Sequence, residues 1–191
     1  MTTQAVKAPT TVNGVNVDQL LATIEAVKSN PELAKCKFRA ETEWISGGHS
    51  RTKIQDFYAA GQEDGSRTKP FVLDGDEPPV LLGENAGPNA VEAILHALAS
   101  CLAVGFIYNA AASGVKVESL TFSVEGDLDL HAFLGLSDKS RPGYENVKLT
   151  YQIKSDAPQA KIVELCNYVQ KTSPVLDILR NPVPVSVSLV D

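Results

Sequence analysis

The strongest constraint on the fold is an unbroken stretch, from Ala93 to Ala112, that contains no charged side chain. A helix of about 20 such residues is long enough to span a bilayer. The stretch is rich in alanine, however. It lacks the flanking Lys/Arg residues and the aromatic belt that are typical of a membrane-spanning helix. It also holds several polar side chains: His96, Ser100, Cys101, Tyr108 and Asn109. We therefore predict a helix buried on nearly all sides in a soluble protein, with no membrane partner.

Local signals define both ends of this helix. Asn89 stands just before it, where an amide side chain caps the free backbone N–H groups of the first turn. Gly114 follows the stretch and is a typical helix stop, because glycine adopts the left-handed conformation at low cost. The helix is expected to run from residue 90 to about residue 113.

The segment before the helix predicts antiparallel strands. Polar and apolar residues alternate over residues 37–45 and again over residues 52–58, and the glycine-containing turn at residues 46–50 separates the two runs. This pattern is typical of a β-hairpin. Further along we expect a polar loop at 60–70, a short strand at 71–73 and a loop at 74–79.

The segment after the helix combines strands with helices. Apolar residues alternate with polar ones at 120–125 and at 147–153, which indicates two strands. A second helix is expected from Pro158 to Ser173, where Pro174 breaks it. A short helical piece at 176–179 and an edge-type strand at 182–187 complete the chain. Strands that cluster before and between helices predict an α+β fold, with antiparallel sheets packed on helices.

Length and charge limit the class of protein. The 191 residues suit one domain, expected at residues 36–191, with residues 1–35 as an appendage formed by a tail and an amphipathic helix. The net charge is −6 and no basic patch is visible, so nucleic acid is not expected as a partner. Residues 1–12 contain no apolar signal-peptide core, which favours the cytoplasm.

The three cysteines, Cys36, Cys101 and Cys166, are dispersed and form no CxxC pair. An odd, sparse set of this kind argues against a disulfide framework, and together with three dispersed histidines it predicts no metal site and no bound cofactor. Of the three, Cys101 lies in the middle of the long helix. Judged alone, a thiol on an apolar helix is typical of a small core residue, and a mid-helix position gains little from the helix dipole.

Several ordered segments nevertheless resemble a known family. Residues 87–92, then Leu95 and residues 97–101, are similar to the motif before the peroxidatic cysteine of OsmC/Ohr proteins. Residues 173–175 are similar to the Cys-Pro-Val segment that holds the second cysteine of these proteins. The stretches Gly126-Asp127-Leu128-Asp129 and Arg141-Pro142-Gly143-Tyr144 fit the intervening region. The resemblance covers about residues 37–189, and the N-terminal helix is similar to a longer OsmC-like branch.

This resemblance implies both a fold and an activity. The fold is an intertwined homodimer, in which antiparallel sheets surround two central helices. The activity is the reduction of organic hydroperoxides: the thiolate of Cys101 attacks the peroxide and becomes a sulfenic acid, a second cysteine condenses with it, and an external dithiol reduces the resulting disulfide. In this family an arginine stabilises the thiolate and a glutamate orients the arginine.

The chain departs from the family pattern at the second cysteine, because Ser173 occupies that position. Cys166 lies about two helical turns earlier, or about 10 Å along the axis. A disulfide requires Cα atoms within about 7 Å. Cys166 is therefore a resolving thiol only if the helices are shifted relative to the family, and otherwise a structural core residue.

The supporting arginine and carboxylate also stay open. Arg51, after the hairpin turn, is our first choice for the arginine, with His49 in an alternative register and Arg39 in reserve. The family's glutamate position holds Val91, so Glu92, one residue later, is the candidate carboxylate. The alternatives in the preceding loop are Glu77 and Glu84.

The sequence thus supports two functions. The first is a thiol-dependent peroxidase that acts on organic hydroperoxides through Cys101, in defence against oxidative or osmotic stress. The second is a weakly active or non-catalytic OsmC-like protein that binds a small apolar ligand in a pocket at the dimer interface. The missing second cysteine favours the second function, whereas the retained Cys101 favours the first.

Overall fold

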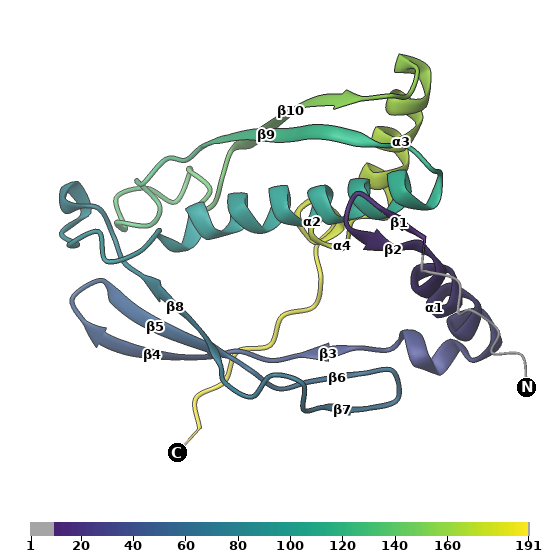
Figure 1. Ribbon diagram of the computed structural model, residues 1–191. Helices are drawn as coiled ribbons and strands as arrows, with labels where there is room; N and C mark the ends of the chain where they lie inside the picture. The colour runs from purple at the N-terminus through teal and green to yellow at the C-terminus, as the bar shows by residue number, and fades with distance from the viewer. Residues whose placement is uncertain (1–9, 191) are drawn as a thin grey trace, which may run out of the picture. The chain divides into compact units, whose positions relative to one another are not determined.

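The computed structural model describes residues 10–190 (Figure 1). The chain divides into two compact units. Residues 18–94 form the first, called here the hairpin unit, and the rest of the described chain forms the second, called the helix–sheet unit. The long helix α2 (Ala90–Ala112) begins in the hairpin unit and continues through the helix–sheet unit.

The hairpin unit opens with helix α1 (Val17–Ser29) and the 3-10 turn η1 (Pro31–Ala34). Its strands form two three-stranded antiparallel sheets. One has the order β4-β5-β8 and contains β4 (Glu41–Ser46), β5 (His49–Ile54) and β8 (Phe71–Gly75). The other has the order β3-β6-β7 and contains β3 (Lys37–Phe38), β6 (Phe57–Ala59) and β7 (Gln62–Asp64). A second 3-10 turn, η2 (Pro79–Leu81), precedes α2.

The predicted hairpin is confirmed, but both of its strands are interrupted. Residues 39–40 and 55–56 leave the ladder, so one arm pairs as β4 with β5 and the other as β3 with β6. The polar loop expected at 60–70 is wrong in part, because it contains β7. Ala60 and Gly61 both have positive φ, 50° and 82°, and make the tight turn between β6 and β7. Alanine rarely adopts this conformation, so residue 60 carries no turn signal.

The helix–sheet unit is built on one long hairpin, in which β9 (Val117–Asp127) pairs antiparallel with β10 (Asn146–Ser155). Both strands alternate intermediate and exposed residues along most of their length, as expected when one face packs on helices. Helix α3 (Gln159–Thr172) and the short helix α4 (Pro174–Arg180) follow. The unit also includes a small N-terminal hairpin that sequence patterns did not predict, β1 (Thr11–Val12) and β2 (Val15–Asn16).

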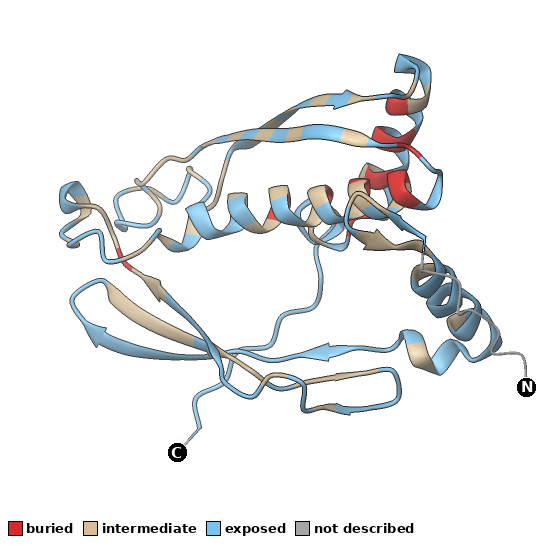
Figure 2. Cartoon of the chain, in the orientation of Figure 1, coloured by how far each residue is buried: buried red, intermediate tan, exposed pale blue. Residues whose placement is uncertain are grey.

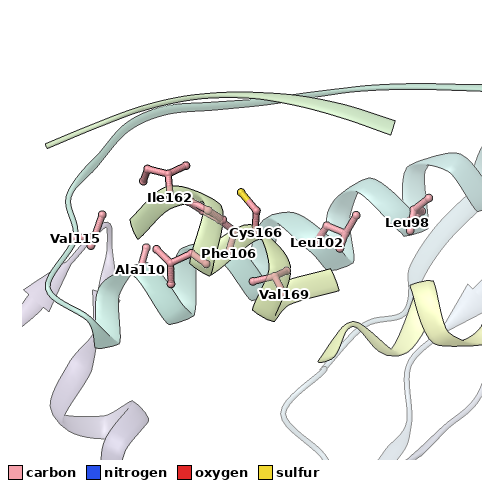
Figure 3. Close-up of a cluster of buried hydrophobic side chains, with 9 residues drawn as sticks. Leu98, Leu102, Phe106, Ala110, Val115, Ile162, Cys166 and Val169 are labelled. Carbon is pink, nitrogen blue, oxygen red and sulfur yellow. The ribbon is translucent and has the colours of Figure 1, made fainter. Parts of the chain in front are cut away.

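The core of this unit lies between α2 and α3 (Figure 3). Helix α2 contributes a buried residue at every fourth position, because residues four apart share one helix face. These residues are Leu98, Leu102, Phe106 and Ala110, and they meet Ile162, Leu165, Cys166 and Val169 of α3 together with Val115. Apolar residues of β9 and β10, among them Phe122 and Tyr151, pack against this cluster.

Burial of α2 is incomplete within the single chain. The helix ends as predicted, with Gly114 at φ 70°, but within the chain it is buried along one face only (Figure 2). Val104 and Tyr108 on its other faces are 46% and 47% exposed. Within the single chain, α3 and the apolar residues of β9 and β10 cover this one face. Burial on nearly all sides, which the resemblance places in a homodimer, stays a prediction. By length and composition α2 could also cross a membrane, a criterion that core helices of soluble proteins meet as well.

The strand predicted at 182–187 is also wrong, because no strand is assigned there. Pro182 and Pro184 remove two backbone donors, and Val185 and Val187 are 79% and 93% exposed. The alternating pattern is present, but no neighbouring strand pairs with it in the described part of the chain.

Candidate functional site

The candidate site is centred on Cys101, which is partly exposed on the surface of α2. The hydroxyl of Ser173 donates a hydrogen bond to its sulfur, with 3.2 Å between Oγ and Sγ. Ser173 is itself only 5% exposed. The fold therefore brings the predicted reactive cysteine into contact with the residue that occupies the second-cysteine position.

The break between α3 and α4 explains how Ser173 reaches this place. Pro174 cannot continue α3, and it forces the preceding residue out of the helical region. Ser173 accordingly has φ −74° and ψ 116°, and it ends α3 and begins α4. Its Oγ accepts a hydrogen bond from the backbone N–H of Leu176 at 3.2 Å, so the side chain caps α4 and is held in one orientation.

Cys166 lies elsewhere in the same unit. It is buried, and its sulfur points towards the β-strands (Figure 3). Burial raises the pKa of Tyr151 to about 12, and a hydrogen bond with Cys166 acts in the same direction. The Tyr151 hydroxyl also accepts a hydrogen bond from Gln170 at 3.2 Å. Cys166 thus contacts Tyr151, whereas Cys101 contacts Ser173. The resolving role of Cys166 therefore stays a prediction.

A small apolar cavity lies beside Cys166 and Tyr151. Its volume is about 10 Å³, which is about the room that one water molecule needs. It is lined by Leu102, Phe106, Phe122, Tyr151, Cys166, Val169 and Gln170. A cavity of this size cannot hold an organic hydroperoxide or another organic ligand.

In the hairpin unit, Arg51 belongs to a cluster of three charged or titratable side chains. Arg51 on β5 lies directly opposite Asp74 on β8, and its Nε donates to Oδ1 of Asp74 at 2.9 Å. His49, two residues before Arg51 and hence on the same face of the strand, contacts the same oxygen through Nε2 at 2.8 Å. The hydrogen bonds from His49 and Arg51 lower the pKa of Asp74. Arg51 and His49, proposed as alternatives, thus share one carboxylate partner.

The other candidates have different partners. Glu92 and Asn89 form a capping box, because each side chain accepts a hydrogen bond from the other's backbone N–H at 2.9 Å. The Asn89 side-chain amide also donates to Glu77 at 3.4 Å. Arg39 binds Glu63 through both terminal nitrogens at 2.8 Å. Glu92 therefore has a structural contact at the helix start, and the carboxylate that contacts Arg51 is Asp74.

Sequence reasoning missed Asp74, which it assigned to a loop. No local sequence signal marks Asp74, because its contact depends on the register of the sheet: β8 extends to Gly75, which places residue 74 opposite residue 51. The neighbouring Asp76 is buried and accepts backbone hydrogen bonds from Glu77, Glu84 and Ala86. The bonds from Ala86 and Glu84 are the main cause of a lowered pKa of Asp76. Asp76 thus fixes the loop that leads into α2.

No three His, Cys, Asp or Glu side chains gather into a possible metal site within residues 10–190. The arrangement instead offers one thiol with a hydroxyl donor, and separately one arginine held by a carboxylate. The first pair fits chemistry at sulfur, because a hydroxyl that donates to a thiolate stabilises the charged form.

Comparison with protein families gives a match for this chain. The model of a family described as OsmC-like protein matches residues 83–188, which include α2, β9, β10, α3 and α4. No curated protein matches the chain.

Several solved structures are similar in fold. An OsmC-like protein from Mycoplasma pneumoniae has a TM-score of 0.58 and 17% identity, over 76% of this chain and 89% of the other. An OsmC-like protein of unknown function from Vibrio cholerae has a TM-score of 0.56 and 16% identity, over 74% and 92%. An organic hydroperoxide resistance protein OsmC from Legionella pneumophila has a TM-score of 0.52 and 18% identity, over 76% and 90%. At these identities the likeness establishes the fold.

Proposed function

We propose that this chain, which belongs to the OsmC-like protein family, is a thiol-dependent peroxidase that reduces organic hydroperoxides through Cys101. The observation that carries the proposal is the contact between Cys101 and Ser173. A partly exposed cysteine that touches the residue at the second-cysteine position is the arrangement that the family resemblance leads us to expect. One relative of similar fold is named an organic hydroperoxide resistance protein.

The chemical step begins at the sulfur of Cys101. Its thiolate attacks the outer oxygen of ROOH, the O–O bond breaks, and RO⁻ leaves and takes up a proton as ROH. The cysteine is left as a sulfenic acid. A cation beside the sulfur would favour the thiolate and steady the leaving oxygen, and we propose Arg51 for this role.

Asp74 supports the choice of Arg51. The Asp74 carboxylate accepts a hydrogen bond from Nε of Arg51, which fixes the guanidinium plane. The two terminal nitrogens can then bind another partner. We therefore propose Asp74 as the carboxylate that orients the arginine, in place of Glu92, whose carboxylate caps α2. His49 shares Asp74 and adds a second donor to the cluster.

We also propose that the active form is a homodimer in the cytoplasm. Support comes from α2, which exposes apolar side chains such as Ile94, Val104 and Tyr108. Covering such surface with a second copy would remove it from water. In such a dimer the Arg51 of either chain could serve a given Cys101. An external dithiol is the proposed reductant.

One observation favours a second candidate function. Ser173 stands where the family has its second cysteine, so turnover through the usual internal disulfide is closed to this chain. A weakly active or non-catalytic protein that binds a small apolar ligand is the alternative.

Consumption of cumene hydroperoxide with a dithiol reductant distinguishes the two functions. We expect wild type to consume the peroxide and Cys101→Ser to fall to the rate of the reductant alone. Cys36→Ser is the matched control, because Cys36 is exposed and outside the site. If wild type is no faster than Cys101→Ser, the chain is not a peroxidase. If Cys166→Ser loses turnover while its Cys101 still oxidises, Cys166 is the resolving thiol.

A further inference from the structure

The structure places the hydroxyl of Ser173 beside Cys101, with the hydroxyl donating a hydrogen bond to the sulfur, which the sequence could not reveal. We propose that Ser173 is a positioning residue that donates a hydrogen bond to the Cys101 thiolate, and that oxidised Cys101 is recycled by external small thiols through a mixed disulfide. This inference rests on the proposed peroxidase function. It assigns Ser173 a role of its own and extends the proposed reductants from external dithiols to small monothiols.

The direction of the hydrogen bond is set by the second contact of Ser173. Its oxygen already accepts the backbone N–H of Leu176, so the hydroxyl proton is free to point elsewhere. The sulfur of Cys101 lies 3.2 Å away, and Ser173 is 5% exposed, which leaves little room for water as an alternative partner. A buried hydroxyl needs an acceptor. A thiolate is a better acceptor than a thiol, so the contact favours the reactive form.

The same residue determines how Cys101 reacts once it is oxidised. A serine hydroxyl does not condense with a sulfenic acid to a disulfide, because it has no sulfur to form the S–S bond. Cys166 is the other thiol described in this unit, and its contact is with Tyr151. The sulfenic acid of Cys101 therefore has the hydroxyl of Ser173, not a thiol, as its described neighbour.

Because Cys101 is partly exposed, a small thiol R′SH can reach it. The thiol sulfur attacks the sulfenic sulfur, the S–O bond breaks, and water leaves, which gives a mixed disulfide between Cys101 and R′. A second R′SH attacks this disulfide, and R′SSR′ and the free thiol of Cys101 are released. The sum is ROOH + 2 R′SH → ROH + H₂O + R′SSR′, so two electrons from the thiols reduce the peroxide. An external dithiol performs the same two steps with one molecule.

The first experiment traps the oxidised cysteine. Protein is treated with one equivalent of cumene hydroperoxide, then with dimedone or with glutathione, and mapped by mass spectrometry. We expect wild type to carry dimedone on Cys101, or glutathione as a mixed disulfide. We expect Ser173→Cys to form an internal disulfide with Cys101 and to lose the dimedone adduct, because its sulfur would replace an oxygen already in contact. An internal disulfide between Cys101 and Cys166 in wild type would overturn the proposal.

The second experiment needs no peroxide. The rate at which iodoacetamide alkylates Cys101 is measured against pH for wild type, Ser173→Ala and Ser173→Thr, in the Cys36→Ser background. Loss of a hydrogen bond to a charged group should slow alkylation of Cys101 at neutral pH by about tenfold in Ser173→Ala. Ser173→Thr keeps the hydroxyl and the helix cap, and should restore the wild-type profile. Identical profiles for Ala and wild type would refute the role of Ser173.

The two experiments separate the possible failures. If Cys101 does not react with peroxide but the alkylation profile shifts in Ser173→Ala, the peroxidase function fails while the contact stands. If peroxide is consumed but the profile does not shift, the peroxidase stands and the role of Ser173 fails. If Ser173→Ala does not fold, disulfide formation in Ser173→Cys, driven by a mild oxidant, decides whether residue 173 contacts Cys101; its absence would overturn the proposal.

Discussion

Replacement of Leu102 by alanine should destabilise the helix–sheet unit strongly. Leu102 is 4% exposed and lies in the core between α2 and α3. The substitution removes three buried carbon groups, worth about 2.4 kcal/mol at about 0.8 kcal/mol each. It also enlarges the small cavity that Leu102 lines, and the cavity adds to the loss. We therefore expect the free energy of unfolding to fall by about 3–4 kcal/mol, within the range of about 2.7–5.0 kcal/mol seen for such substitutions.

The loss is measured by urea denaturation followed by circular dichroism, at one protein concentration because assembly would affect stability. A fall in melting temperature of about 6–16 °C should accompany it for a chain of this size. Val163→Ala is the control: Val163 lies on α3 but is 47% exposed, so its loss should cost less than about 1 kcal/mol. Equal losses for the two variants would show that the cluster around Leu102 is not the core of this unit.

Three further outcomes are expected. Asp74→Asn should lower kcat/KM for cumene hydroperoxide by about tenfold or more, because the Arg51 guanidinium loses the carboxylate that orients it; unchanged kinetics would remove Asp74 from the proposed site. Hydrogen bonds from the backbone and side chain of His131 lower the pKa of Asp129 to about 2. The ionised carboxylate therefore contributes stability above about pH 4, and this contribution is lost as the pH falls towards about 2. In a carbon-13 NMR titration the Asp129 midpoint should move upward in His131→Ala; an unmoved midpoint would contradict this account. Asp76→Ala should speed limited proteolysis between residues 77 and 86, since three backbone N–H groups of this loop lose their acceptor; equal cleavage rates would mean that Asp76 does not hold the loop.

Much of the secondary structure could be predicted from the sequence, because its signals lie within a few residues of each other. The capping box of Asn89 and Glu92 begins α2, and Gly114 ends it. Pro174 separates α3 from α4 at the expected residue. In each case the residue that starts or ends the helix acts on backbone groups less than two helical turns away.

The predictions that differ from the structure share a physical cause. Each concerns a feature that depends on more than the local pattern of residues. Residues 182–187 have the alternating pattern of a strand, but a strand forms only where another strand pairs with it, and the described part of the chain supplies none. The apolar sequence of α2 predicts burial, but the number of its faces that are buried depends on what packs on them. β7 was missed because its turn uses Ala60 in a conformation that alanine seldom adopts.

The amino-acid sequence alone was enough for the α+β class, the ends of the main helices and the resemblance that singles out Cys101 and Ser173. It could not determine which side chains meet. Arg51 pairs with Asp74 because the register of β5 and β8 places them opposite each other. Ser173 meets Cys101 because α3 packs on α2 and ends at a proline. Such contacts join residues far apart in the chain, and only the packing of helices and the register of strands bring them within hydrogen-bonding distance.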